Sequence, residues 1–395
     1  MKRWRLRQMI NRVHLYLGLA ALLPLIMLSL TGALLVFETE IDHWLNPHLW
    51  YVTPQEQRLP YQTLYEQVKA TFPTSTITSL SLPLADDLAS VFFTEDERMI
   101  HLDPYRGTFL GERMYGQTVM GVMYTLHVSF FAGDVGSYLA GTAALILLGM
   151  IGTGLYLWWP RGAHKRRSFV VKWRAAWRRT NYDLHRTVGF YASLVLLVIA
   201  LTGVIFTFSA LAEPLVYWLT HSSPPNRHPE VTPQAGVSSI SIDAALTVSG
   251  RHVPNSTPTT VMFPDTPRSP LRITRRLPWQ PVVTGRTYIF INPYTGDVIQ
   301  EISPRTAPLG TQLLFWNYPL HVGVFGGIAT RLLWLLASLV PTMLAITGVL
   351  IWCKPRRRRH LSTPTATPNR QSVSLRLRKA SESRRQRQQI DGGPV

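Results

Sequence analysis

One apolar stretch near the start of the chain, residues 11–37, constrains the fold more than any other feature. It contains one histidine, His14, and Gly32 follows that histidine by eighteen residues. A run of this length can cross a bilayer, which takes about 20 mainly apolar residues. A similar stretch starts at residue 181, and there Gly203 follows His185 by the same eighteen residues. A histidine at one register of two membrane helices is a candidate ligand.

Four stretches in all are candidate membrane spans. Their approximate limits are 13–37, 135–159, 186–210 and 328–352. Each is mainly apolar and has the length that a membrane helix needs. The first follows a basic leader, but its apolar part is too long for a cleaved signal peptide and no A-x-A site follows it. It therefore indicates a retained signal anchor.

The basic residues indicate the orientation of the spans. The 395 residues include 40 Lys and Arg against 22 Asp and Glu, and 25 of the basic residues lie before residue 14, in 161–179 or after residue 352. Such segments face the cytoplasm by the positive-inside rule. We expect both termini in the cytoplasm and the two long loops on the external side of the membrane. Topology explains the charge, so we expect no nucleic-acid partner.

The last segment, residues 354–395, is basic and polar. It lacks the apolar residues that a folded core needs, which predicts a disordered cytoplasmic tail that touches anionic membrane lipid. Cys353 is the only cysteine. The sequence therefore excludes an internal disulfide and a c-type haem attached through C-x-x-C-H.

The two long loops between the spans resemble each other. In the loop 38–126, residues 61–72 have helical apolar spacing, and the alternating segments that follow end in a hairpin with the turn D-P-Y-R-G. The loop 211–320 repeats this order and ends in a hairpin with the turn N-P-Y-T-G. A Pro, a Tyr, a Gly and a Glu of the two hairpins match at one offset of 189 residues. This pattern predicts an internal duplication in which each half carries a small external α+β domain.

The second helix of each half supports the duplication. An L-H-V motif precedes it in both halves. Gly154 follows His127 by 27 residues, and Gly348 follows His321 by 27 residues. That interval corresponds to about 40 Å of helix, more than the ~30 Å hydrocarbon core. We therefore expect both histidines at the external face, on short helices that precede the spans.

These observations predict an α-helical membrane protein with a four-helix transmembrane core and two small external α+β domains. In chain order, the expected parts are the cytoplasmic N-terminus and first span (1–37), the first external domain (38–126), the second span with its short helix (127–160), a basic cytoplasmic loop (161–184), the third span (185–210), the second external domain (211–320), the fourth span with its short helix (321–353) and the tail (354–395).

The four matched histidines predict two haem sites at two depths. His14 and His185 begin helices that leave the cytoplasm, so they lie near the inner face, whereas His127 and His321 lie near the outer face. Neutral imidazole is a good iron ligand, and a b-type haem needs no covalent link to the chain. Zinc or copper is the alternative, but histidine pairs without cysteine or carboxylate are sparse sites for these metals. The pattern favours two bis-histidine haems b that carry single electrons across the membrane.

Each predicted core helix also carries a Thr-Gly pair, which allows two interpretations. Small residues let membrane helices pack closely. The glycines also make room for a haem bound by the other helix pair, and both functions are compatible. The four glycines are Gly32, Gly154, Gly203 and Gly348.

Several other polar residues are weaker candidates. Arg186 and Arg12 flank the inner histidines and are candidate partners of haem propionates, and Arg106 and Arg331 are similar candidates on the outer side. The positive-inside rule already explains Arg12 and Arg186. Two further histidines, His43 and His48, are candidates to face a substrate or the outer haem, and decoration of the membrane interface is their alternative role.

The helix motifs and the hairpins together resemble the PepSY-associated transmembrane helix family. The motifs are an asparagine shortly before the histidine, L-T-G after it, L-H-V, T-G with a tryptophan beyond it, and the D/N-P-Y-x-G hairpins, and they cover residues 11–353. The family includes siderophore reductases of the bacterial inner membrane. The resemblance implies PepSY-like external domains, two haems b and one-electron reduction of a ferric siderophore in the periplasm. It leaves open the electron donor, a cytoplasmic reductase or quinol.

An arginine-rich surface is the predicted dock for the ferric siderophore. It includes Arg272, Arg275 and Arg276 in the second external domain. Two other functions remain open. The external domains of a membrane-anchored chaperone or peptidase modulator would not use the histidines, and a haem b reductase of copper or quinone would use them for another acceptor.

Overall fold

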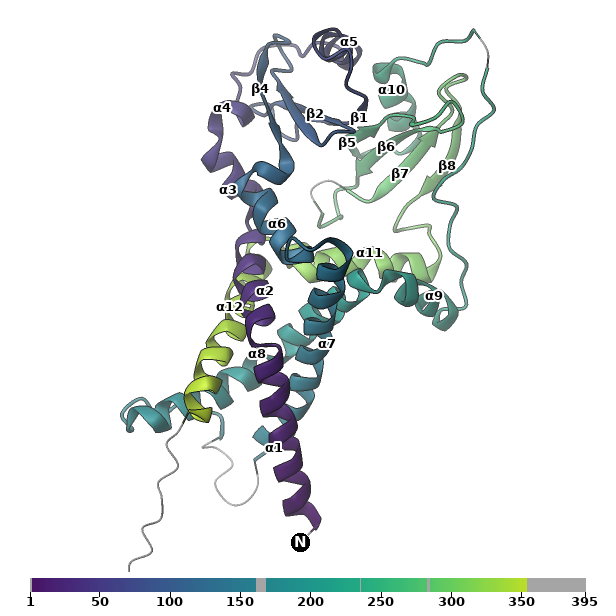
Figure 1. The fold of residues 1–395 in the computed structure, drawn as a ribbon. Helices are drawn as coiled ribbons and strands as arrows, with labels where there is room; N and C mark the ends of the chain where they lie inside the picture. The colour runs from purple at the N-terminus through teal and green to yellow at the C-terminus, as the bar shows by residue number, and fades with distance from the viewer. Residues whose placement is uncertain (1, 161–167, 235, 283–284, 354–395) are drawn as a thin grey trace, which may run out of the picture. The chain divides into compact units, whose positions relative to one another are not determined.

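The computed structural model describes residues 2–160, 168–234, 236–282 and 285–353. Residues 2–352 form one compact unit that contains long apolar helices and an antiparallel sheet domain (Figure 1). The predicted tail, residues 354–395, lies outside the described residues, as does 161–167 of the predicted cytoplasmic loop.

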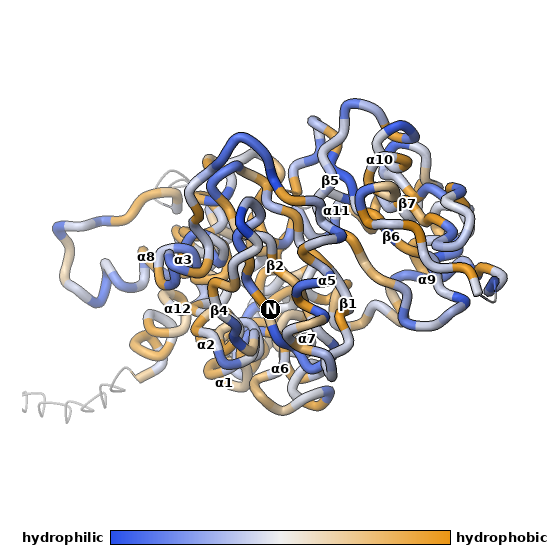
Figure 2. The backbone as a smooth tube through the Cα atoms, turned by 90° about the horizontal axis from the view of Figure 1, so that it is seen from above, coloured by the Kyte–Doolittle hydropathy of each residue, from blue (hydrophilic) through white to orange (hydrophobic). Residues whose placement is uncertain are grey.

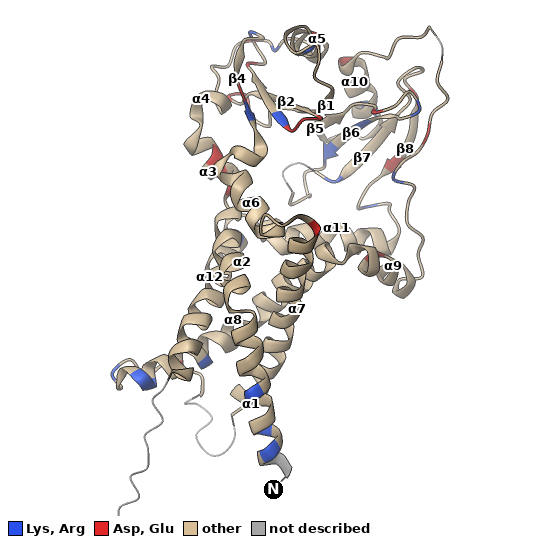
Figure 3. Cartoon of the chain, in the orientation of Figure 1, with Lys and Arg blue, Asp and Glu red and all other residues tan. Residues whose placement is uncertain are grey.

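Three helical segments are long and apolar enough to cross a membrane. They are α7 (Gly133–Trp158), α8 (Trp177–Thr207) and the segment Val324–Trp352, which consists of the 3-10 turn η3 (Val324–Gly326) and α12 (Gly327–Trp352). A fourth candidate is the pair α1 (Lys2–Ala20) and α2 (Leu22–Leu35), which meets the same criteria only when taken together. Lys and Arg lie toward the N-terminal end of α1 and at the start of α8 (Figure 3). Seen from above, these helices are largely hydrophobic (Figure 2).

The first predicted span, 13–37, is not one straight helix. α1 and α2 meet at a bend of 63°. Pro24 lies one turn beyond the break and has no N–H to donate to the carbonyl of Ala20, so the helical ladder is interrupted there. Ala21 at the break is buried and still donates its N–H to the carbonyl of Leu17. The bend therefore has a local cause in the sequence.

Helices from the two halves of the chain pack against each other. α7 packs against α8 and α1, and α12 packs against α2 and α8. Shorter helices lie between these and the sheet domain in sequence and carry the chain from one to the other. They are α3 (Glu38–Leu45), α4 (Pro47–Trp50), α6 (Val119–Ser129), α9 (Ser209–Leu219) and α11 (Leu309–Val322).

The sheet domain contains one sheet of eight antiparallel strands, in the order β4-β3-β2-β1-β5-β6-β7-β8. The first half of the chain supplies β1 (Ile77–Ser81), β2 (Ser90–Thr94), β3 (Arg98–Leu102) and β4 (Phe109–Met114), which leads into the turn η1 (Tyr115–Gln117). The second half supplies β5 (Thr257–Met262), β6 (Leu271–Arg276), β7 (Thr287–Ile291) and β8 (Val298–Ile302). The helices of the domain are α5 (Tyr61–Thr71) and α10 (Ile242–His252).

The expectation of two separate external domains is wrong in one respect, because the two halves share a single sheet. β1 pairs with β5, and Leu80 lies opposite Val261 in that pairing. Both side chains are fully buried in a core that includes residues of α5 and α10. An exposed edge strand leaves a row of backbone groups unpaired, and edge-to-edge pairing satisfies them. The sequence predicts the strands but not which edges meet.

The two helices on the sheet cap each other across the boundary between the halves. Asp243 of α10 accepts hydrogen bonds of 3.0 Å from the backbone N–H groups of Tyr61 and Gln62 at the start of α5. Gln62 in turn accepts one of 3.1 Å from the N–H of Ile242, the first residue of α10. The first N–H groups of a helix have no partner within it, so each half satisfies donors of the other.

Candidate functional site

The four matched histidines form two pairs. His14 of α1 faces His185 of α8, with 6.5 Å between the ring centroids and 88° between the ring planes. His127 of α6 faces His321 of α11, with 6.3 Å between the centroids and 62° between the planes. Each pair takes one histidine from each half of the chain. We call them the inner pair and the outer pair.

A threonine holds one nitrogen of each histidine ring. In the first half, the Nδ1 atom of His14 lies 2.8 Å from Oγ1 of Thr153. In the second half, Thr202 and Thr347 make the same contact at 2.9 Å with His321 and His185. Thr31 completes the set, 2.9 Å from Nδ1 of His127. Each histidine is thus held by a threonine of its own half.

The hydroxyl protons of these threonines are already in use. Thr153 donates to the carbonyl of Gly149 at 2.8 Å, one turn earlier in its own helix. The other three donate in the same way, at 2.7 or 2.8 Å. A hydroxyl has one proton, so its oxygen accepts the hydrogen bond from Nδ1–H of the histidine. The neutral ring then keeps the lone pair of Nε2 free for a metal.

The glycine after each threonine lies against the same ring. A Cβ added at Gly154 would lie 3.3 Å from Cε1 of His14, and one at Gly32 would lie 3.0 Å from Cε1 of His127. Gly203 and Gly348 have the same relation at 3.3 Å to the histidines of the second half. Gly32 and Gly203 thus lie against the outer rings, and Gly154 and Gly348 lie against the inner rings. In the structure, the space beside each glycine is occupied by the imidazole ring.

The second half adds an asparagine to each site. Asn181, one turn before His185, donates to the backbone carbonyl of Thr347 at 3.1 Å. Asn317, one turn before His321, donates to the backbone carbonyl of Thr202 at 3.3 Å. The matching positions of the first half hold Ile10 and Met123, so this brace exists in one half only.

The spacing of the rings suits one metal atom between them. A metal bonded at about 2 Å to one nitrogen of each ring places the two ring centres a little over 6 Å apart. The two observed separations, 6.5 and 6.3 Å, agree with this spacing. Within the described residues, no group of three or more His, Cys, Asp and Glu side chains gathers into a metal site. Each pair therefore offers two imidazole nitrogens.

The predicted arginines have other partners. Arg186 lies 3.4 Å from the buried carboxylate of Asp183 on its own helix. Arg331 bonds Glu40 and the carbonyl of Val36. Arg106 lies 3.8 Å from Asp103.

The predicted siderophore dock is wrong for one of its three arginines. Arg275 is buried, and its guanidinium donates to Ser249 at 3.0 Å and to Ser256. Alternate residues of a strand face opposite sides, so Arg275 faces α10 and its neighbours Arg272 and Arg276 do not. The guanidinium of Arg272 lies over the ring of Tyr288, 5.4 Å from its centroid.

The two other candidate histidines stand apart from the pairs. His43 stacks on Trp50, with 4.3 Å between the ring centroids. His48 is exposed on α4. The structure therefore brings together the four matched histidines and their glycines, and it adds the threonine hydroxyls and the two asparagines. The Thr-Gly pairs and the asparagines were visible in the sequence, but their hydrogen bonds were not.

Apolar helices that carry two registered histidine pairs, joined to an antiparallel sheet domain, define a class of membrane protein. Residues 11–354 match the sequence model of the PepSY-associated TM region. The chain belongs to this family. No curated protein matches it.

Proposed function

We propose that the chain is a di-haem b protein of the bacterial inner membrane that passes single electrons across it and reduces a ferric siderophore in the periplasm. The observation that carries this proposal is the pairing of four histidines in two sites of equal construction, each ring held through Nδ1 by a threonine. It assumes that α1 and α2 together form the fourth span of the predicted core.

The donor set fits haem better than a bare metal ion. Zinc and copper sites in proteins take three or four protein ligands, and each pair here offers two. A porphyrin brings four nitrogens of its own, so two axial imidazoles complete the site. A haem iron with both axial positions filled by histidine transfers single electrons and does not activate oxygen.

The residues of this chain have distinct tasks in that function. The threonines fix the ring orientation and the tautomer, and the glycines leave room for the Cε1 edge of each ring against the neighbouring helix. The two pairs sit on opposite ends of the long helices, because His14 lies on α1 and its threonine near the end of α7, whereas His127 precedes α7. Electrons would enter at the inner pair and leave at the outer pair.

The substrate class rests on the resemblance to siderophore reductases. Siderophores hold Fe(III) tightly and Fe(II) weakly, so one electron added to the ferric chelate releases the metal. The sheet domain is the proposed place where the chelate binds. The donor on the cytoplasmic side is a reductase or a quinol.

An optical spectrum of the purified full-length chain tests the proposal. We expect a b-type haem spectrum, and His127→Ala or His321→Ala should each remove about half of the haem absorbance, because each deletes a ligand of one of two sites. Both variants should also lose reduction of a ferric hydroxamate by the reduced protein. His48→Ala is the matched control, since His48 is exposed and belongs to neither pair.

The result that contradicts the proposal is equally clear. A colourless protein, or full haem content in both outer-pair variants, would exclude bis-histidine haem ligation by these residues. Dispensable histidines in a folded protein would instead support the chaperone or peptidase-modulator alternative. Transfer of electrons from the reduced protein to Cu(II) or quinone, but not to ferric chelates, would support the other haem b reductases.

A further inference from the structure

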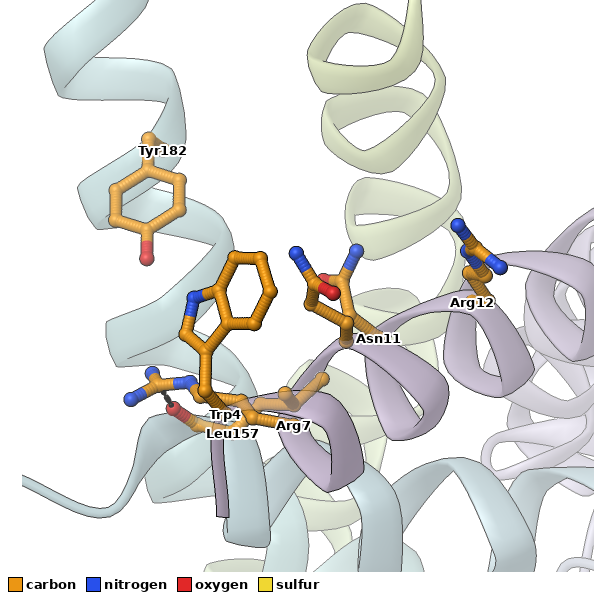
Figure 4. A pocket seen from close by; sticks show the side chains of 7 residues that line it. Trp4, Arg7, Asn11, Arg12, Leu157 and Tyr182 are labelled. Atoms are coloured by element: carbon orange, nitrogen blue, oxygen red, sulfur yellow. Dashed lines mark hydrogen bonds between the residues drawn. The ribbon is translucent and has the colours of Figure 1, made fainter. Parts of the chain in front are cut away.

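A polar pocket lies between the start of α1 and the neighbouring helices α7 and α8. Its volume is about 480 Å³. Five of its lining residues recur at helical spacing on α1, so they form one face of that helix. Tyr182 of α8 and the backbone of Leu157 of α7 close the opposite side (Figure 4). The residues from α1 are Trp4, Arg7, Gln8, Asn11 and Arg12.

Each of the three helices that line the pocket also carries a residue of the inner site, namely His14, Thr153 or His185. Asn11 lies three residues before His14, and Tyr182 lies three residues before His185. Leu157 lies four residues after Thr153, the threonine that holds His14. Three or four helical residues correspond to about 5 Å along each helix. The pocket therefore has lining residues about one helical turn from His14, Thr153 and His185.

The lining has the chemistry of an anion site. Arg7 is held in place by a hydrogen bond of 2.9 Å to the carbonyl of Leu157, and Arg12 extends the positive charge along the same face of α1. The amides of Gln8 and Asn11 add further donors. None of the described residues that line the pocket is Asp or Glu. Guanidinium groups at such a site bind carboxylate and phosphate oxygens.

The pocket also offers flat aromatic surface. The indole of Trp4 is 67% exposed and stands beside the opening, with the ring of Tyr182 across from it (Figure 4). The guanidiniums of Arg179 and Arg186 lie over the ring of Tyr182, 6.0 and 5.8 Å from its centroid. An aromatic ring that is open to a pocket of ligand size provides a stacking surface for a planar ligand.

We infer that this pocket binds a planar aromatic molecule that carries phosphate or carboxylate groups, and that the reduced form of this molecule would supply single electrons to the haem proposed at the inner pair. The ring stacks at Trp4 and Tyr182, and the anionic group binds Arg7. The guanidinium of Arg12 points away from that of Arg7 (Figure 4) and adds positive charge at the other end of the pocket. A reduced ring that gives up two electrons in two single steps also releases two protons, which leave to the solvent. The electron transfer rests on the proposed function, whereas the binding does not.

Three probes separate the ring from the anion in a binding experiment. The full-length chain in phosphatidylcholine nanodiscs is titrated with flavin mononucleotide, with riboflavin, which lacks the phosphate, and with inorganic phosphate, which lacks the ring. Flavin fluorescence reports the first two directly, and phosphate is measured by competition. We expect flavin mononucleotide to bind about tenfold or more tightly than either other probe, because a hydrogen bond to a charged group adds that much.

Two arginine variants test the anion subsite. Arg7→Gln should weaken binding of flavin mononucleotide about tenfold or more and leave binding of riboflavin unchanged. Arg12→Gln should weaken it less, because this guanidinium acts through its charge alone. Arg7 also donates to the carbonyl of Leu157, and weaker binding of riboflavin to Arg7→Gln would reveal damage from the loss of that hydrogen bond. Arg174→Gln is the control, since this exposed arginine precedes α8 and does not line the pocket.

Three results would overturn the inference. They are equal binding of flavin mononucleotide and riboflavin, unchanged binding in both arginine variants, and loss of binding in nanodiscs of anionic phosphatidylglycerol, which would make the pocket a lipid-headgroup site. His14→Ala separates this inference from the proposed function. That variant should lose haem absorbance but still bind flavin mononucleotide, so each claim can fail without the other.

Discussion

The two halves of the chain build the same histidine sites on different helices. In both halves a histidine donates Nδ1–H to a threonine of the same half, and the following glycine lies against the ring. The differences lie elsewhere. The first half bends by 63° between α1 and α2, whereas α8 runs unbroken over 31 residues and has Val195 where the first half has Pro24. The helix path therefore differs between the halves, whereas the histidine, the threonine and the glycine are the same at each site.

The asparagine brace is the other difference. The second half holds each threonine through its backbone carbonyl as well as through its hydroxyl, and the first half does not. The two ligands of one metal would therefore have unequal support. This teaches that the histidine, threonine and glycine are the common requirement and that the asparagine is an addition of one half.

The largest expected effect comes from filling the space against an outer ring. Gly32→Val should displace His127, because even a Cβ at this position would lie 3.0 Å from the ring, and the outer half of the haem absorbance should be lost. Gly203→Val, where the distance is 3.3 Å, should cause a smaller loss. Haem content of the purified variants measures both. Gly152→Val is the control, since nothing lies within 4 Å of its added Cβ; equal haem in all three would show that the ring needs no such space.

The second effect compares the two halves of the sheet. His101 of β3 is fully buried, and its repeat counterpart is Phe290. Neither ring nitrogen has a hydrogen-bond partner among the described residues. Burial, and then the nearby Arg113 guanidinium, lower the pKa of His101 from 6.5 to about 4. The unfolded chain therefore binds the proton first, so stability falls as the pH drops below 6.5 and is lowest below 4. The full loss amounts to about 3 kcal/mol.

His101→Phe should remove this pH dependence and leave stability at pH 7 nearly unchanged or higher. Thermal unfolding of the sheet domain within the full-length protein, measured between pH 7 and pH 4, checks it. The prediction fails if the variant and the parent lose stability in parallel over that range.

The third effect is on the threonines. Thr202→Val keeps the shape of the side chain but removes the acceptor for Nδ1–H of His321, and loss of such a partner weakens metal binding about 10- to 100-fold. The reduction potential of the outer haem should also rise, since the ligand becomes less basic. Thr202→Ser should restore both. Thr31→Val is the matching change in the first half, and a redox titration that finds no shift in either variant contradicts the assigned role.

The smallest effect concerns the shared helix caps. Asp243→Ala removes two hydrogen bonds to the start of α5 and should cost about 1 kcal/mol of unfolding free energy, the usual loss for a capping side chain. Gln62→Ala removes one capping hydrogen bond, to the start of α10, together with an exposed hydrogen bond to Glu66, and should cost less. Chemical denaturation measures both. The double variant tests whether the two caps act together, and strict additivity would mean that the halves are not coupled through them.

The sequence predicts the histidine pairs because spacing along a helix is a local property. Equal intervals in two halves place His14 level with His185 and His127 level with His321, and the pairing follows from the duplication. The strands and the D/N-P-Y-x-G hairpins are equally local. The bend near Pro24 was also readable, since proline removes a helical donor, but the length of the apolar run suggested one straight span.

The rest depends on contacts between distant segments. The pairing of β1 with β5 joins edges that are far apart in sequence, and alternation along a strand does not identify its partner. The burial of Arg275 depends on α10 and the Ser256 loop, which no charge pattern reveals. The threonine hydroxyls could be noted in the sequence, yet their role depends on the ring that meets them.

The pairing of each histidine with one from the other half has a consequence for how such a chain originates and assembles. Each half holds all of the threonines and glycines that orient its own two histidines, but it supplies one ligand to each site. The contact between the halves is therefore isologous, as in a homodimer with a twofold axis that passes between the rings of both pairs. A half-length chain would be self-complementary, and fusing two copies makes the second subunit permanently available at high local concentration.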